Sequence, residues 1–290
     1  MIDQNRLENY LGAILAKSAL GDTPKGLSEA VRYAVFPGGA RVRPRLLMAV
    51  ALANGDDQPE LTDAAAAAIE MLHCASLVHD DLPVFDGASL RRGKPSVHVT
   101  FGQPLAILAG DALIVHAFEI LGKAGAMAPQ RLPALLGIVA GGVGMPGGIV
   151  AGQAWECEKD VDLSQYQQAK TGALFAAATM AGAAAAGADP APWRTLGQCI
   201  GEAYQVADDL LDANGDALTA GKPVGQDQNH DRPNAVREMG QGKSAQRLRS
   251  LVEEALDSIP ACPGEEPLRA LIGQESEQFM KLALNRAAAA

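Results

Sequence analysis

The sequence predicts an all-α protein built as one helical bundle, with residues 1–290 forming a single domain. Hydrophobic residues make up 48 % of the 290 residues and aromatic residues only 4 %. A composition so rich in Ala and Leu favours helices over sheet. Alternating apolar and polar positions, the signature of strands, are nearly absent, and no linker or short repeat divides the chain.

Helices are expected wherever apolar positions recur at helical spacing. Several of these segments begin with residues typical of a first helical turn, namely Asp63, Pro104, Pro129, Ser164 and Pro190. The expected helices cover residues 4–16, 25–33, 44–54, 62–81, 104–124, 129–143, 147–156, 164–184, 190–211, 232–240, 244–258 and 265–284.

Charge and cysteine usage exclude several classes of protein. The formal net charge of −10 argues against a nucleic acid partner, because phosphate backbones recruit basic surfaces. The cysteines are scattered, which predicts reduced thiols in the cytoplasm rather than disulfides or a thiolate metal site. The charged N-terminus does not resemble a signal peptide. Residues 132–153 and 173–189 are nearly uncharged, but their Gly and Ala content predicts closely packed helices rather than membrane spans.

Two clusters of carboxylates follow apolar helical segments. Asp80, Asp81 and Asp86 lie within seven residues, and Pro83 can turn the chain so that Asp86 comes back toward Asp80. The second cluster holds Asp208, Asp209 and Asp212, and its first and last members share one helix face. We expect antiparallel neighbouring helices to bring the two clusters face to face.

Clustered acid at a helix end is costly unless a cation shares the site. No paired His or Cys lies near either cluster, so the pattern favours Mg²⁺, which takes carboxylates and substrate phosphates. Basic residues near turns fit that picture, because Arg and Lys bind phosphates. They include Arg41, Arg43, Arg91 and Arg92, together with Lys170 and Lys222. The two sets together predict a site for a diphosphate.

Taken in their order along the chain, the motifs resemble those of the trans-prenyl diphosphate synthases over roughly residues 33–256. The matching segments are Gly38 to Pro44, Asp80 to Asp86 with Arg91-Arg92-Gly93, Gly152-Gln153, Lys170-Thr171-Gly172, Gln205, and Asp208 to Asp212. The resemblance is strongest to the geranylgeranyl diphosphate synthases of bacterial carotenoid and photosynthesis gene clusters. Residues 74–81, 232–236 and 259–264 carry that part of it.

The resemblance implies a bundle around a central cavity and a role for each matching residue. Its catalytic residues would be Asp80, Asp81, Asp86, Arg91, Lys170, Asp208, Asp209 and Asp212. The metal ligands would be Asp80, Asp86, Asp208 and Asp212, holding several Mg²⁺ ions, about three per site, for which Mn²⁺ can substitute. The allylic diphosphate would lie on Arg91, Lys170, Thr171, Gln205 and Lys222, and isopentenyl diphosphate on Arg43, His73 and Arg92. His73 lies two helical turns before Asp80, on the same face.

The same resemblance implies condensation of isopentenyl diphosphate with dimethylallyl, geranyl or farnesyl diphosphate, with release of diphosphate. Small residues at Ala75 and Ser76, just before Asp80, imply a pocket long enough for geranylgeranyl diphosphate, and a homodimer is the usual assembly. Ala40, Arg232 and Asn234 depart from the family pattern of Lys, Lys and Thr. Ala40 should weaken binding of isopentenyl diphosphate unless Arg41 or Arg43 compensates.

Other readings of the motifs stay open at this point. One is farnesyl diphosphate synthase, with the same chemistry and a shorter product. Another is a metal phosphohydrolase of the His-Asp type, suggested by His79-Asp80, although it would leave the second cluster unexplained. A non-catalytic subunit would be expected to lose its acidic motifs, and both motifs are present. A terpene cyclase also uses an aspartate-rich motif, but Arg91-Arg92 and the second cluster fit a condensing enzyme better.

Overall fold

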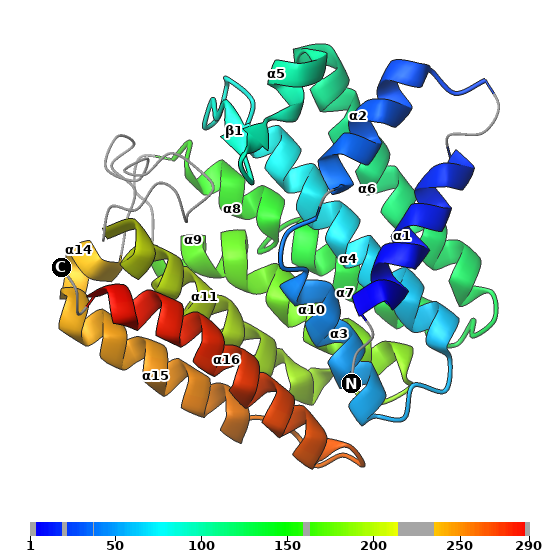
Figure 1. Cartoon of the computed structure of the whole chain (residues 1–290). Coiled ribbons are helices and arrows are strands. Elements are labelled where there is room, and N and C mark those ends of the chain that lie inside the picture. Colours follow the sequence, from blue (N-terminus) through cyan, green and yellow to red (C-terminus); the bar gives the residue numbers. More distant parts are fainter. Residues whose placement is uncertain (1–3, 19–21, 37, 159–162, 214–234, 288–290) are drawn as a thin grey trace.

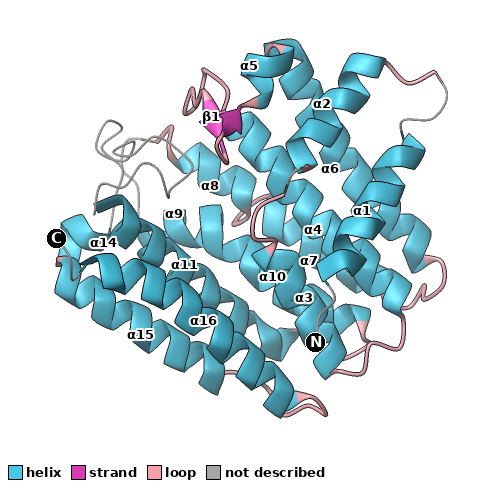
Figure 2. Cartoon of the chain, in the orientation of Figure 1, coloured by secondary structure: helices cyan, strands magenta, loops and turns pink. Residues whose placement is uncertain are grey.

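The computed structural model confirms the predicted fold class: helices make up almost all of the regular structure (Figures 1 and 2). It describes residues 4–18, 22–36, 38–158, 163–213 and 235–287. The helices of the first half are α1 Gln4–Ser18, α2 Lys25–Val35, α3 Val42–Ala53, α4 Pro59–Asp80, α5 Val97–Phe101, α6 Gln103–Gly125 and α7 Leu132–Val143. Those of the second half are α8 Ile149–Trp155, α9 Leu163–Gln167, α10 Ala173–Ala185, α11 Arg194–Ala213, α14 Ala235–Met239, α15 Gln241–Asp257 and α16 Glu265–Ala287.

The centre of the bundle is formed by α4 and α10. In α10 every residue after Ala173 is buried, and in α4 the run Ala64 to Ala68 is completely inaccessible. Side chains this small let neighbouring backbones approach closely. Gly197 of α11 shows the same effect, because a Cβ there would lie 2.5 Å from the Ala176 Cα of α10. The Ala-rich segments therefore serve close helix packing, as their composition predicts.

The directions of three helices bring both carboxylate clusters to one end of the bundle. Lys170, just before α10, lies 3.6 Å from Asp80 at the end of α4. At the other end of α10, the Ala185 carbonyl accepts a hydrogen bond from Arg131, which also binds Asp57 just before α4. Thus α10 runs antiparallel to α4, and α11, which follows by way of a short 3₁₀ turn, runs back alongside α10 (Figure 1).

Consequently the two helices that end in Asp clusters are parallel, and α10 lies between them. The two helices that carry the clusters are therefore not antiparallel neighbours of each other, and that part of the expectation is wrong. Each cluster lies at the C-terminal end of its helix, so only parallel helices can bring the clusters to the same end. The neighbouring pairs α4–α10 and α10–α11 are nevertheless antiparallel, in keeping with the expected antiparallel bundle.

The periodicity of the sequence does not predict three local features. A two-stranded hairpin pairs β1 Leu90–Arg91 with β2 Lys94–Pro95, and its turn places Arg92 and Gly93 at positive φ. The short helix α5 follows the hairpin directly. The expected helix 164–184 is divided into α9, a π-helical turn at Gln168–Gly172 and α10. Of the expected helix 232–240, the described part is α14.

Within the described residues, two helices, α4 and α6, are long and apolar enough to cross a membrane, by length and composition alone. In α4, 78 % of the most apolar window is buried inside the protein, as expected of a core helix. In α6 the buried share is 39 %, so this helix presents an apolar face to its surroundings. Exposed side chains on it include Ile107, Leu108 and Val115. Burial in the core of a single chain therefore does not explain the apolar residues on this face of α6.

Candidate active site

The first carboxylate cluster forms where α4 ends. Beyond Asp80 the chain turns through Pro83, and the amide of Asp86 donates to the carbonyl of Asp80 at 3.0 Å. Gly87 completes the turn with a φ of 59°, and its amide donates to Leu82. Because the turn closes on the end of the helix, Asp86 returns beside Asp80, as the position of Pro83 predicts.

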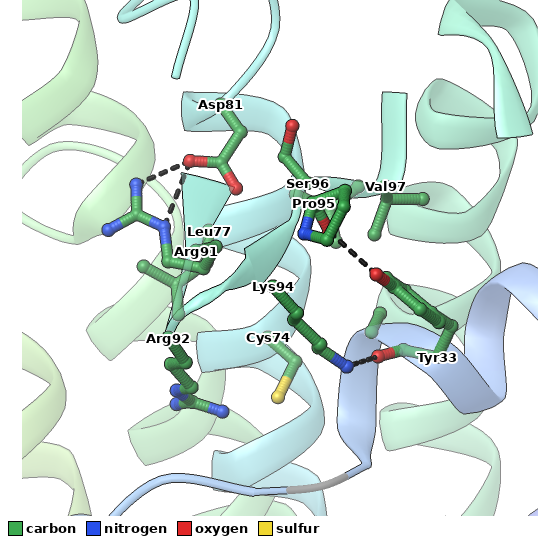
Figure 3. A pocket seen from close by; sticks show the side chains of 12 residues that line it. Tyr33, Cys74, Leu77, Asp81, Arg91, Arg92, Lys94, Pro95, Ser96 and Val97 are labelled. Carbon is green, nitrogen blue, oxygen red and sulfur yellow. Dashed lines mark hydrogen bonds and ion pairs between the residues drawn. The ribbon is translucent and has the colours of Figure 1, made fainter. Parts of the chain in front are cut away.

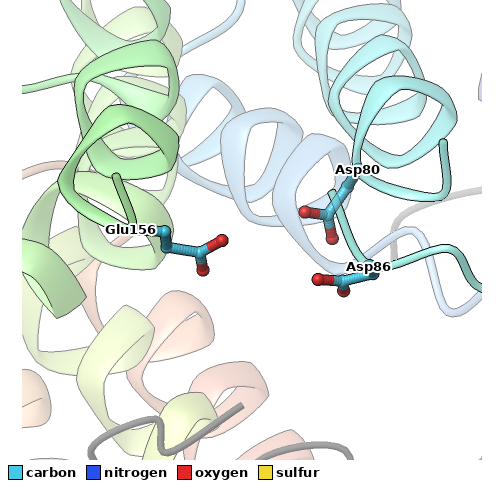
Figure 4. Close-up of side chains that lie close together, drawn as sticks. All are labelled: Asp80, Asp86 and Glu156. Atoms are coloured by element: carbon cyan, nitrogen blue, oxygen red, sulfur yellow. The ribbon is translucent and has the colours of Figure 1, made fainter. Parts of the chain in front are cut away.

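A third carboxylate faces this pair from another helix. Oxygen atoms of Asp80, Asp86 and Glu156 lie within 4.8 Å of one another (Figure 4). Glu156 lies at the end of α8, in an otherwise apolar segment, and sequence reasoning did not single it out. It carries the same signal as the two Asp clusters, an acidic residue at the end of an apolar helix, but as a single residue it is far less conspicuous.

Lys170 lies between the carboxylates. Its ammonium nitrogen is 2.5 Å from Glu156 Oε1 and 3.6 Å from Asp80 Oδ1. Glu156 also accepts hydrogen bonds from the Tyr166 hydroxyl and the Gln153 amide. The π-helical turn at Gln168–Gly172 carries Lys170, and such turns are frequent at functional sites. Gly152 allows the close approach, because a Cβ there would collide with the backbone of Lys170.

The pKa of Asp80 is raised from its ordinary value. Burial is the largest cause, and the charges of Asp86 and Glu156 act in the same direction, whereas Lys170 and Arg91 oppose the shift. Among the residues that the structure describes, Asp80 Oδ1 is a buried oxygen without a hydrogen-bond partner. An oxygen in this state is the kind of ligand that a divalent cation would satisfy.

Asp81, although adjacent to Asp80, anchors the hairpin instead of joining the three carboxylates. Its side chain is buried, and Arg91 donates to Asp81 Oδ1 from Nε at 2.9 Å and from Nη2 at 2.5 Å (Figure 3). Arg91 Nη2 also lies 3.8 Å from Asp80 Oδ2. Arg91 therefore spans the two aspartates, with its guanidinium held at the edge of the acidic site.

The other strand of the hairpin is tied to α2. Lys94 donates to the carbonyl of Tyr33 (Figure 3) and to that of Phe36, both at 2.7 Å, at the C-terminal end of α2. A cavity of about 20 Å³ lies among α2, α4 and the hairpin, lined by residues that include Cys74, Asp81 and Arg92. Since Arg91 and Arg92 belong to this hairpin, α2 and α4 together fix where the two arginines lie.

A separate group of basic residues lies around Arg43, within range of the charges of Glu70 and Asp208. Arg43 Nη1 lies 3.4 Å from His73 Nε2, and the Arg43 guanidinium lies over the Phe175 ring at 4.3 Å. Burial lowers the pKa of Arg43 to about 10. Burial, then the charges of Arg43 and Arg92, lower the pKa of His73 well below its ordinary value. Arg43 Nε is buried without a hydrogen-bond partner among the described residues.

The second cluster is arranged differently from the first. Thr171 donates to Gln205 Oε1 at 3.0 Å, and Gln205 donates to Asp209 Oδ1 at 2.9 Å. The other oxygen of Asp209, a buried residue, accepts from the backbone amide of Ala235 at 2.8 Å. Asp209 thus links the site to the beginning of α14.

Asp208 and Asp212 are the more accessible members of the second cluster: Asp208 is exposed and Asp212 half-buried. Asp208 is close enough to raise the pKa of Arg43, although burial outweighs it. The group of three carboxylates includes neither residue. Three other residues singled out from the sequence, Lys222, Arg232 and Asn234, lie outside the described residues.

The two residues expected to limit product length lie on α4 below Asp80. Ala75 is buried in the main hydrophobic core, which also contains Leu113 of α6 and Leu174 of α10. Ser76 is half-buried, and its hydroxyl donates to the His73 carbonyl at 2.8 Å. A larger side chain at Ala75 would therefore displace core residues, whereas Ser76 has more room.

Comparisons with known proteins agree on one family. The family model described as "Polyprenyl synthetase" matches residues 24–264. The chain is 54 % identical over 280 residues to a geranylgeranyl diphosphate synthase of Cereibacter sphaeroides, with 97 % of each chain covered. It is similar to the crystal structure of a geranyltransferase from Legionella pneumophila, with a TM-score of 0.81, 27 % identity, and 96 % of this chain and 94 % of that one covered.

A second similar structure is that of a geranyltransferase from Helicobacter pylori complexed with magnesium and isoprenyl diphosphate. Its TM-score is 0.76 at 26 % identity, with both chains covered completely. The family model spans well over half of the chain, and the curated relative matches it almost from end to end. The chain belongs to the polyprenyl synthetase family.

Proposed function

We propose that this protein condenses isopentenyl diphosphate with allylic diphosphates and makes geranylgeranyl diphosphate as its main product. The observation that carries the proposal is the division of the site into an acidic part and a basic part. Asp80, Asp86 and Glu156 form the acidic part, and Arg43 with His73 the basic one. Two diphosphate substrates need such a division, one bound through metal ions and one bound by cations of the protein.

Mg²⁺ is the cation that fits the acidic part. The donor set of the acidic part consists of carboxylates, and Asp80 Oδ1, which lacks a hydrogen-bond partner among the described residues, suits a hard divalent ion. Asp80 and Asp86 would hold Mg²⁺ on the allylic diphosphate, with Asp208 and Asp212 completing the site from α11. About three ions per site are expected, with Mn²⁺ as a substitute. Bound there, the metal would supply Lewis acidity toward the departing diphosphate.

The remaining residues would bind the two diphosphates. Arg91 and Lys170, already next to Asp80, would hold the allylic diphosphate together with Thr171, Gln205 and Lys222. Isopentenyl diphosphate would bind to Arg43, His73 and Arg92. The depressed pKa values of Arg43 and His73 support this assignment, because burial, their largest cause, disfavours the charged forms and a bound anion would favour them.

The chemistry follows from this placement. Lys170 and Arg91 stabilise negative charge as the allylic carbon–oxygen bond breaks, which leaves an allylic cation. The buried Ala and Leu side chains of α4 and α10 exclude water that would quench the cation. The alkene of isopentenyl diphosphate then attacks, and the released diphosphate accepts the proton that is lost. No nucleophilic side chain is required.

The geranylgeranyl product is preferred over the farnesyl one on two grounds. Ala75 and Ser76 are small side chains, so neither would place a bulky floor in a pocket below Asp80. The relative at 54 % identity is a geranylgeranyl diphosphate synthase. That product is a precursor suited to carotenoid biosynthesis, the context expected from the sequence.

We also propose a cytoplasmic homodimer that buries the apolar face of α6. Leu108 and Val115 are exposed on one face of the helix, Ile107 is exposed beside them, and Val115 is 68 % exposed. Contact between two copies of this face would remove apolar surface from water. Residues 1–290 would act as one domain in each subunit.

The test is incubation of the purified protein with labelled isopentenyl diphosphate and each allylic starter, with and without Mg²⁺, followed by separation of products by chain length. Geranylgeranyl diphosphate formed only with metal supports the proposal. Farnesyl diphosphate as the end product would support the shorter-chain alternative. Release of phosphate without carbon–carbon bond formation would favour a phosphohydrolase.

A further inference from the structure

Arg41 has an unusual backbone and a buried charge two residues before Arg43. It forms the N-cap of α3 in the left-handed conformation, with φ of 52° and ψ of 36°. A residue with a Cβ seldom adopts this conformation unless its surroundings hold it there. The chain direction that leads into α3, and hence the place of Arg43, depends on that turn.

The side chain of Arg41 is held from three sides. Nε donates to Glu8 Oε1 of α1 at 2.8 Å, Nη1 to Glu70 Oε1 of α4 at 2.5 Å, and Nη2 to the Val35 carbonyl of α2 at 2.8 Å. Arg41 is 7 % exposed and Glu70 1 % exposed. The guanidinium is thus fully engaged inside the protein, so it does not replace the Lys missing at Ala40.

The same contacts hold together the elements that carry the basic part of the site. Glu70 precedes His73 by one turn of α4, and Arg41 precedes Arg43 at the start of α3. The Glu70–Arg41 pair therefore ties α4 to α3 next to the place where Arg43 meets His73 at 3.4 Å. Gly38 lies directly on the Arg41 guanidinium, and a Cβ at Gly39 would lie 2.9 Å from Arg92 Nε.

We propose that Arg41 is a positioning residue whose contacts with Glu8 and Glu70 set the affinity for isopentenyl diphosphate. The inference rests on the proposed function, which assigns Arg43, His73 and Arg92 to that substrate. Glu8 is the accessible end of the arrangement, with a side chain 39 % exposed. The allylic side of the site, at Asp80 and Lys170, makes no contact with Arg41 among the interactions described above.

The test compares Arg41→Lys and Glu8→Gln with the wild-type protein by KM for each substrate, kcat and Tm. Lys keeps the charge but loses the planar fork that reaches three partners. We expect Arg41→Lys to raise KM for isopentenyl diphosphate about tenfold and Glu8→Gln about threefold, the size of one misplaced contact. The KM for farnesyl diphosphate should stay within about twofold.

Arg6→Gln is the matched control on α1. Arg6 binds Asp56 and Asp63 near the start of α4, away from the Arg41 turn. The Arg6→Gln substitution should lower Tm without changing the KM for either substrate. A lower Tm with unchanged KM values in Arg41→Lys and Glu8→Gln, or equal increases of both KM values, would overturn the inference.

Two further outcomes can be distinguished from a refutation of this inference. If Arg41→Lys does not fold, Glu8→Gln carries the same expectation and the same refutation, since Glu8 is half-exposed. If the wild-type protein forms no prenyl product at all, the proposed function fails and no variant is needed to show it.

Discussion

Lys170 and Glu156 form an ion pair of 2.5 Å beside Asp80, between the π-helical turn before α10 and the end of α8. The pair places a fixed positive charge against the acidic site and so offsets part of the repulsion between Asp80 and Asp86. It also holds Lys170 where a departing diphosphate would need a cation. Its two residues come from helices that only the fold brings together.

Removing the carboxylate of Glu156 tests this pair. Glu156→Gln should lower turnover about tenfold, because Lys170 loses its charged partner and the Tyr166 hydroxyl loses a carboxylate acceptor. Steady-state kinetics at saturating Mg²⁺ measures the effect. Cys157→Ser, at the exposed neighbouring position, is the control and should behave like the wild type. Unchanged turnover in Glu156→Gln would mean that Lys170 is positioned by other contacts.

Loss of the proposed metal ligand should have a larger effect. Asp80→Ala should lower turnover by about 10²–10³-fold or more, because the charge that develops on the leaving diphosphate is no longer neutralised. Treating the wild-type protein with a chelator should give a comparable loss that Mg²⁺ restores. Asp257→Asn, an exposed change at the end of α15, is the control. Near-normal turnover of Asp80→Ala would refute the metal assignment.

Product length can be tested at two positions with different room. Ala75→Tyr should shift the products from geranylgeranyl toward farnesyl diphosphate and, because Ala75 is buried, should destabilise the fold by about 1–3 kcal/mol. Ser76→Phe, at the half-buried neighbour, should shorten the product at a smaller cost in stability. Chromatography of the products, with Tm measured in parallel, separates the two effects. If neither variant changes the chain-length distribution, the floor of the pocket lies elsewhere.

His73 should make stability depend on pH. Its pKa is lowered in the folded protein, so the unfolded chain binds more protons as the pH falls below about 6.5. The stabilisation from neutral His73 is therefore present above that pH and is lost as the pH falls toward the folded pKa, at up to about 1.4 kcal/mol per pH unit. Denaturant unfolding of wild type and His73→Gln between pH 7.5 and 5.5 measures this. The difference between the two proteins should shrink at low pH, and a constant difference would contradict the expectation.

The α6 face gives a prediction about assembly. Val115→Asp should convert the proposed homodimer to monomer, because a charge in the middle of a buried apolar interface would be left unpaired. Sedimentation or size-exclusion chromatography with light scattering reports the mass. Leu282→Asp places the same charge at an exposed apolar position of α16 and should leave the assembly as in the wild type. A wild-type monomer would show that the face serves another purpose.

The sequence by itself determined the fold class, the placement of most helices and the family. Its Ala-rich periodicity predicts helices that pack closely, and its aspartate and arginine motifs stand in an order specific enough to name the family. The turn that returns Asp86 to Asp80 was also predictable, because the conformational limits of Pro83 act within a few residues.

Only the tertiary structure decided which distant charges meet. It placed Glu156 opposite Asp80, set Asp81 against Arg91, buried Arg41 between two glutamates, and made the helices with the Asp clusters parallel across α10. The physical reason is the range of the interactions involved. Helix propensity and turn chemistry act between residues near in sequence, whereas ion pairs depend on where packing brings whole helices, and many residues contribute to that packing at once.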